Sequence, residues 1–310
     1  MNIIFMGTPD FAVPSLVKLH EQGYNIDLVV TQKDKPRGRG KKIQYPPIKQ
    51  KALEFGLEVY QPDSVNNEES IAKFRELKPD VIVVVAFGQI LKKKLLEIPK
   101  YDCINVHASL LPKYRGAAPI NWAIINGESE TGITIMQIEE GLDSGDIILS
   151  QSISITPKDD FESLHDKLSV LGGELLIKAL EEIKIGKDNR VPQDDNLSSY
   201  APMISKSTGK IDWNKSGKDI YNLVMGLRPT PSAYTIYNDL IMKIHKVSLK
   251  PKMDNEEIGK VIKVNREGIF VNSKDNCVVI EEIQFPGKKR MSVKDYLAGN
   301  KIEEGIIFNS

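Results

Sequence analysis

The sequence is poor in residues that build covalent or metal cross-links. It holds two cysteines and four histidines among 310 residues. Cys103 and Cys277 lie far apart and show neither disulfide nor metal-site spacing, so we expect buried thiols in a reducing compartment. The histidines show no paired spacing, which argues against a His-based metal site. We therefore expect no bound metal.

Long hydrophobic runs are missing too. No stretch approaches the roughly 18 apolar residues of a membrane span. The opening MNIIFMGTP enters an apolar strand without a signal or transit pattern. The turn after that strand, Gly7 to Asp10, lacks the GxGxxG pattern of dinucleotide-binding folds. We expect a cytoplasmic protein without a membrane partner, and a monomer.

An overall excess of charge is absent, because 42 basic residues balance 42 acidic ones. Residues 31–51, however, hold eight basic residues and one acid, a net charge of +7. Their glycines and prolines predict an irregular loop. A strongly basic loop on a neutral protein indicates local contact with a polyanion, and a solvated surface loop is the plainer alternative.

Alternating strands and helices are what the first part of the chain does have. The valine-rich run from Asp80 to Ala86 is typical of a strand covered on both faces. This alternation predicts an α/β fold with a doubly wound, mostly parallel sheet. Short, regularly spaced strands after Ala233 predict a small C-terminal β-barrel. We predict a catalytic domain over 1–187, a polar linker over 188–208 and the β-barrel domain over 209–310.

The stretch CINVHASLLPKYRGAAP, from Cys103 to Pro119, carries the predicted chemistry. Asn105 and His107 are two residues apart on a predicted strand, so their side chains share one face where the strand meets a loop. A second loop, Glu140 to Gly145, holds Asp143. An amide and an imidazole can stabilise an oxyanion, and a carboxylate can orient the imidazole. This is chemistry for acyl transfer, although a histidine at a strand end is often purely structural.

Two separate blocks, NVHASLLPKYRGAAP and MQIEEGLDSGD, resemble the signature of the folate-dependent formyltransferases. The resemblance implies that Asn105, His107 and Asp143 are the catalytic residues. It implies 10-formyltetrahydrofolate as the formyl donor, with its pterin near Phe87 to Leu91 and the Asp143 loop. The residues expected to line the folate site are Ser109, Leu110, Leu111 and Pro112.

Further segments along the chain resemble one branch of that family, the branch that formylates methionyl-initiator-tRNA. They are IIFMGTPDFAVPSL, GRGKK, SYAPMISKSTGKIDW and LRPTPSAYT. The resemblance gives the basic loop a role at the acceptor end of the tRNA, where phosphate contacts position a nucleic acid. Arg39, Lys41 and Lys42 are the expected contacts. The C-terminal domain would then meet the tRNA further from its end.

Three alternatives stay open at this point. A glycinamide ribonucleotide formyltransferase would share the Asn, His and Asp blocks but lack residues 209–310 and the basic loop. A sugar-nucleotide formyltransferase, such as one acting on a UDP-amino-arabinose, can carry a similar second domain but does not need GRGKK. A non-enzymatic RNA-binding module would explain the basic loop and leave the three matched residues without a role.

Overall fold

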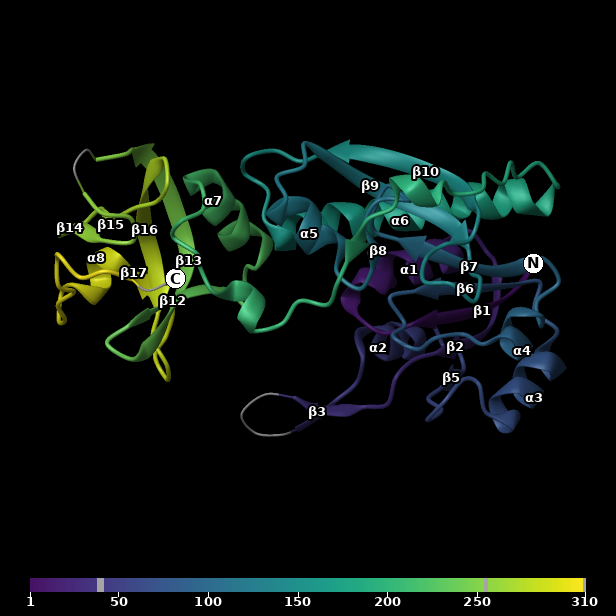
Figure 1. Ribbon diagram of the computed structural model, residues 1–310. Coiled ribbons are helices and arrows are strands. Elements are labelled where there is room, and N and C mark those ends of the chain that lie inside the picture. The colour runs from purple at the N-terminus through teal and green to yellow at the C-terminus, as the bar shows by residue number, and fades with distance from the viewer. Residues whose placement is uncertain (38–41, 254–255, 309–310) are drawn as a thin grey trace. The chain divides into compact units, whose positions relative to one another are not determined.

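The computed structural model describes residues 1–37, 42–253 and 256–308, and it divides the chain into two compact units (Figure 1). The first unit comprises Met1–Pro119, Thr131–Ile153 and His165–Ala201. The second comprises Ile120–Glu130, Ser154–Leu164 and Pro202–Ser310. Each unit has its own sheet and its own buried core. The domain limits at 187 and 209 stay a prediction.

Unit 1 is built on a seven-stranded sheet with the order β10-β9-β7-β6-β1-β2-β5. Its strands are β1 (Asn2–Gly7), β2 (Asn25–Val30), β5 (Val59–Tyr60), β6 (Val81–Val85), β7 (Asp102–His107), β9 (Glu130–Gln137) and β10 (Ile147–Ser154). Neighbours from β5 to β7 run parallel, whereas β7 and β9 are antiparallel. Every residue of β6 is buried, as expected for a strand covered on both faces. The predicted mostly parallel sheet is confirmed.

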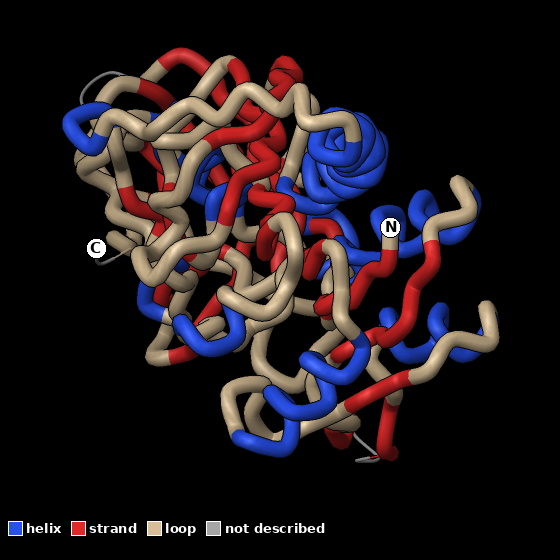
Figure 2. Tube along the Cα trace, turned by 90° about the vertical axis from the view of Figure 1, so that its right-hand side faces the viewer, coloured by secondary structure: helices blue, strands red, loops and turns tan. Residues whose placement is uncertain are grey.

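Helices cover both faces of this sheet. Side chains alternate between the two faces along each strand, so each face contributes to its own buried layer. On one face, Ile71 and Phe74 of α3 (Glu68–Leu77) join Ile4 in a buried cluster. On the other, Gly172 of α6 (Phe161–Lys184) packs against Val106. Figure 2 looks nearly along α6. The helices up to residue 184 are η1 (Asp10–Ala12), α1 (Val13–Glu21), α2 (Pro47–Glu54), α3 (Glu68–Leu77), α4 (Lys93–Leu96), α5 (Pro119–Ile125) and α6 (Phe161–Lys184).

The basic segment is more regular than its composition predicts. Its two arms, β3 (Lys35–Arg37) and β4 (Lys42–Gln44), pair as an antiparallel hairpin. The prediction of an irregular loop is therefore wrong for these arms. A two-stranded ribbon has free outer edges, so it tolerates a proline such as Pro36, which lies opposite Ile43.

Residues 188–201 of the predicted linker belong to unit 1. β11 (Tyr200–Ala201) pairs in parallel with β8 (Arg115–Gly116). Arg190 donates hydrogen bonds to the carboxylates of Asp188 and Asp102, at 2.7 and 2.5 Å. These contacts are made by polar side chains. Because polar composition is also typical of a linker, the sequence of this segment predicted a linker.

Unit 2 contains a six-stranded antiparallel sheet with the order β12-β13-β16-β15-β14, and β17 pairs with β16. The short helix η2 (Asp195–Leu197) still belongs to unit 1. The elements of unit 2 after residue 202 are η3 (Ser207–Gly209), α7 (Gly217–Gly226), β12 (Ala233–Tyr237), β13 (Leu240–Pro251), β14 (Val261–Asn265), β15 (Gly268–Asn272), β16 (Asn276–Gln284), β17 (Met291–Ser292) and α8 (Val293–Tyr296). Ser216 and Asp219 cap α7 reciprocally. Trp213 is fully buried in the core under the sheet. The predicted C-terminal β domain is confirmed; closure into a barrel stays a prediction.

Candidate active site

Strand β7 places Asn105 and His107 on the same face of the unit 1 sheet. It lies between β6 and β9, and Asn105 pairs with Val84 of β6. His107 ends the strand and is only 5% exposed. Asn105 is half-buried, and no other described residue forms a hydrogen bond with its carboxamide. The amide is thus available to a ligand at the edge of the sheet where parallel strands end.

The surroundings of His107 determine how its ring carries protons. Nε2 lies 3.0 Å from the carbonyl oxygen of Tyr114, which can only accept, so this nitrogen carries a hydrogen. In the neutral ring, Nδ1 is therefore the basic nitrogen. Nδ1 lies 3.7 Å from Oδ2 of Asp143. A hydrogen on Nδ1 would point toward this carboxylate, which can thus orient the ring.

Asp143 is held in place by backbone geometry. Its Oδ2 accepts a hydrogen bond from the backbone N–H of Gly116 at 2.8 Å. Its own φ is +50°, in the left-handed region that non-glycine residues seldom adopt. Two residues later, a Cβ at Gly145 would collide with the carbonyl oxygen of Gln137, so the loop must turn through a glycine there. The predicted meeting of two loops at His107 is present in the structure.

Gln193, which the sequence analysis did not single out, holds the Asp143 loop from outside. Its Nε2 donates to the carbonyl oxygens of Asp143 and Gly145, at 2.9 and 2.7 Å. Its Oε1 accepts from Nε and Nη2 of Arg115, at 3.0 and 2.9 Å. Arg115 is only 4% exposed and also pairs with Asp195 at 2.9 Å. We call Arg115, Gln193 and the two carbonyls the glutamine clamp.

The loop predicted to line the folate site is tied together internally. The Ser109 hydroxyl donates to the carbonyl oxygen of Lys113 at 2.7 Å and is fully buried. Thr134 Oγ1 donates to the Ser109 carbonyl at 2.7 Å and accepts from the Leu111 N–H at 3.2 Å. Leu110 and Pro112 keep partial exposure. Their contact with folate stays a prediction, and Ser109 can contribute only by shaping the loop.

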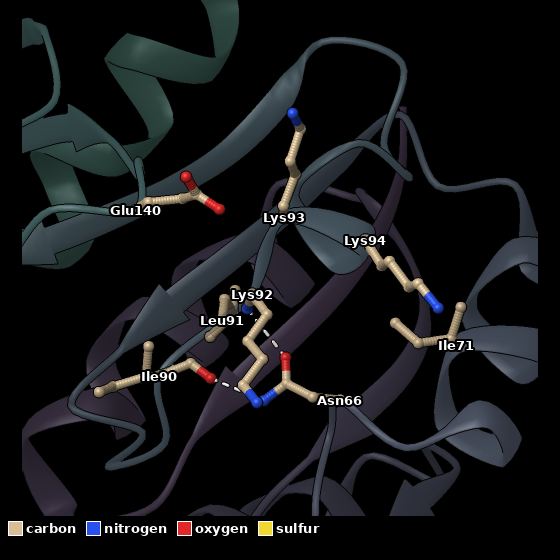
Figure 3. A pocket seen from close by; sticks show the side chains of 8 residues that line it. All are labelled: Asn66, Ile71, Ile90, Leu91, Lys92, Lys93, Lys94 and Glu140. Atoms are coloured by element: carbon tan, nitrogen blue, oxygen red, sulfur yellow. Dashed lines mark hydrogen bonds between the residues drawn. The ribbon is translucent and has the colours of Figure 1, made fainter.

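The other expected wall of the folate site follows β6. The Phe87 carbonyl accepts hydrogen bonds from Thr8 Oγ1 and Gln32 Nε2, both at 3.1 Å, which fixes the start of the loop. A cavity of about 420 Å³ opens beside the same loop (Figure 3). Its lining residues are Asn66, Ile71, Ile90, Leu91, Lys92, Lys93, Lys94 and Glu140.

The predicted tRNA contacts fall largely beyond the part of the chain that the structure describes. Arg39 and Lys41 lie outside the described residues, and Lys42 begins β4 with its side chain likewise outside. On the described side of the hairpin, Ile43 is 69% exposed. These three basic residues stay a prediction.

No described helix combines the length and apolarity needed to cross a bilayer. Nor do the described side chains gather three or more His, Cys, Asp or Glu groups in a way that could hold a metal ion. Both cysteines are buried, and burial raises the pKa of their thiols.

Comparison with known proteins identifies the family. A family model described as formyl transferase matches residues 1–180, and its C-terminal domain model matches residues 203–301. The chain belongs to the formyl transferase family. A methionyl-tRNA formyltransferase of Clostridioides difficile is 52% identical over 99% of both chains. Another formyltransferase of that name, from Geobacter metallireducens, is 51% identical over 99% of this chain and 98% of its own.

Solved formyltransferase structures share the fold at much lower identity. A sugar 3N-formyl transferase, crystallised with dTDP and 5-N-formyl-THF, matches with a TM-score of 0.68 at 23% identity, covering 93% of this chain and 99% of its own. HypX from Aquifex aeolicus, in complex with tetrahydrofolic acid, matches with a TM-score of 0.61 at 16% identity, over 98% of this chain and 50% of its own. At such identities the likeness concerns the fold alone.

Proposed function

We propose that this formyltransferase transfers a formyl group from 10-formyltetrahydrofolate to the α-amine of methionyl-initiator-tRNA. The proposal is supported by identities of 52% and 51% to methionyl-tRNA formyltransferases over 99% of this chain. It is also supported by the position of His107, whose Nδ1 lies 3.7 Å from Oδ2 of Asp143. The product is N-formylmethionyl-tRNA, which serves translation initiation. We expect the protein to act in the cytoplasm, as a monomer.

The residues of β7 and the Asp143 loop suit the donor. When bound, the donor supplies an activated formyl carbon attached to its N10 nitrogen. The Asn105 carboxamide, which no described residue engages, can donate to the oxygen of that carbon when the amine attacks it. His107 can add a second donor only through Nδ1–H, because its Nε2–H is already bonded to the Tyr114 carbonyl. Each donor of this kind is typically worth about 10²–10³ in rate.

Proton movements complete the transfer. A bond forms between the methionyl nitrogen and the formyl carbon, and the bond from that carbon to N10 breaks. The amine loses one proton and N10 gains one. His107 can relay a proton through Nδ1, which lies 3.7 Å from Oδ2 of Asp143. Asp143 thus orients His107 and helps remove the amine proton.

The charge of the hairpin formed by β3 and β4 favours an RNA acceptor. Its segment, residues 31–51, carries a net charge of +7 on a neutral chain. Such a charge favours phosphate contacts at the acceptor end of a tRNA. We infer that Arg39, Lys41 and Lys42 make those contacts. An Arg39→Ala variant that loses neither affinity for methionyl-tRNA nor rate would remove the hairpin from the mechanism.

The decisive test is formylation by purified protein. With 10-formyltetrahydrofolate as donor, we expect methionyl-tRNA to be formylated and a UDP-amino-arabinose not to be; the reverse preference would overturn the proposal. Asn105→Ala and His107→Ala should fold normally, by circular dichroism, yet nearly abolish formylation. Asn126→Ala, which changes the same residue type in unit 2, serves as the matched control. Near-wild-type turnover in either active-site variant would refute their assigned roles.

A further inference from the structure

The carbonyl group that binds His107 belongs to a loop whose backbone turns sharply at Tyr114. The φ angle of Tyr114 is +60°, in the left-handed region, and the residue is only 7% exposed. A residue other than glycine stays in this region only where its surroundings hold it there. The contacts that hold Tyr114 therefore decide where its carbonyl oxygen points, and that oxygen is the acceptor for Nε2 of His107.

Two consecutive peptide groups meet at Tyr114, and the first is bound at both of its edges. Its carbonyl oxygen, on Lys113, accepts a hydrogen bond from Ser109 Oγ at 2.7 Å. Its N–H, on Tyr114, donates to Ser199 Oγ at 2.9 Å. Because a peptide group is planar and trans, its two edges point in opposite directions, and contacts on both edges fix its orientation. The Ser199 hydroxyl supplies the outer contact.

The second peptide group connects Ser199 directly to the catalytic histidine. Its N–H, on Arg115, donates to the carbonyl oxygen of Ser199 at 2.8 Å. Its carbonyl oxygen, on Tyr114, lies on the opposite edge and 3.0 Å from Nε2 of His107. Ser199 thus contacts both peptide groups around Tyr114 from outside, once through its side chain and once through its backbone. A tilt of either group would move the acceptor away from Nε2.

Ser199 is half-buried, belongs to unit 1 and directly precedes β11, which pairs with β8. We propose that Ser199 is a positioning residue for formyl transfer, acting through Tyr114 on His107. By holding the Tyr114 carbonyl against Nε2, it keeps the hydrogen of the neutral imidazole on that nitrogen. Nδ1, which faces Asp143, is then the nitrogen that can take up a proton. The inference rests on the proposed role of His107 in formyl transfer.

The tautomer of His107 can be measured in the full chain without any substrate. In protein labelled with ¹⁵N-histidine, the ring nitrogens of the two neutral tautomers give different chemical shifts. The chain has four histidines, so the signals of His107 are identified by their loss in His107→Gln. In the wild type we expect the neutral ring to carry its hydrogen on Nε2 alone. In Ser199→Ala we expect both tautomers, because the Tyr114 N–H loses its acceptor and the loop is released.

Steady-state formylation provides the second readout. Ser199→Ala should lower kcat about 3- to 10-fold, as the loss of one neutral hydrogen bond implies, with KM for both substrates little changed. Ser199→Thr keeps the hydroxyl and should restore both kcat and the single Nε2–H tautomer. Ser152→Ala removes a hydroxyl from an exposed position of β10, in the same unit, and should alter neither quantity.

The wild-type spectrum alone can overturn the inference, since an Nδ1–H tautomer there would contradict it whether or not any variant folds. A Ser199→Ala protein that keeps the pure Nε2–H form would also overturn it, even if the enzyme is slower. So would a Ser199→Thr protein as slow and as mixed in tautomer as Ser199→Ala. A protein that shows the expected tautomers but formylates no methionyl-tRNA would instead contradict the proposed acceptor and leave the positioning of His107 by Ser199 intact.

Discussion

Replacing Gln193 by glutamate should slow formylation without unfolding the protein. The change keeps the shape of the side chain and its acceptor for Arg115, now as a charge-assisted pair. It removes the Nε2 donor that holds the carbonyls of Asp143 and Gly145 at 2.9 and 2.7 Å. In place of two hydrogen bonds, an anionic oxygen would face two carbonyl oxygens, so the Asp143 loop must move away.

The size of the effect follows from these contacts. Each lost hydrogen bond is worth about 0.5–1.5 kcal/mol, and the stronger pair with Arg115 offsets part of that loss. A net cost of about 1 kcal/mol corresponds to a Tm lowered by about 2–4 °C. The effect on rate is larger, because a shift of about 1 Å in a catalytic group can cost about 10²-fold. We therefore expect kcat to fall about 30- to 100-fold, with KM for the donor little changed.

The measurement is steady-state formylation of methionyl-tRNA across a range of pH, with thermal unfolding in parallel. Because the clamp acts through Asp143 and His107, the pH profile of kcat should shift as well as its height. Gln151→Glu makes the same charge change at an exposed position of β10 and should leave kcat, its pH profile and Tm unaltered. A Gln193→Glu enzyme with wild-type kcat and pH profile would refute the positioning role.

Burial, and then Arg290, lowers the pKa of His245 below the usual 6.5, so the unfolded chain takes up the proton first as pH falls. Stability should be full above pH 6.5 and decline below it, and His245→Gln should flatten the decline in Tm; an unchanged slope would contradict this. Because burial raises the pKa of the Cys103 and Cys277 thiols, neither should react with a thiol reagent until the protein unfolds; rapid labelling of the native protein would show otherwise. Arg190→Leu removes the cation that pairs with the half-buried carboxylates of Asp102 and Asp188 and should cost about 1–3 kcal/mol of stability by denaturant unfolding; an unaltered midpoint would mean that the ion pairs do not contribute to stability.

Local pattern was enough to predict the strand that carries Asn105 and His107. The i, i+2 spacing of these two side chains is a property of a few consecutive residues, and the valine-rich composition of β6 can be read from the sequence in the same way. The basic hairpin shows the limit of local reasoning. Glycine and proline content predicted no regular structure there, yet pairing between Lys35–Arg37 and Lys42–Gln44 overrides it.

Long-range polar contacts could not be predicted in this way. Gln193 is one polar residue within a polar stretch, and nothing in its neighbours distinguishes it. Its importance arises from Arg115, 78 positions earlier, and from Asp143, 50 positions earlier. The left-handed backbone of Asp143 is likewise a product of its tertiary surroundings. The useful signal is Arg115 itself: once it is buried, its several N–H donors need acceptors, and one of these is the amide oxygen of Gln193.

The glutamine clamp bears on how this enzyme can be dissected. A fragment ending at residue 187 would contain Asn105, His107 and Asp143, yet it would lack Gln193 and β11. Such a fragment would keep the catalytic side chains and the Gly116 contact to the Asp143 carboxylate, but it would lose the hydrogen bonds from Gln193 to the backbone of the Asp143 loop. Minimal versions for screening or engineering should therefore extend through Ala201, the last residue whose backbone is paired with β8.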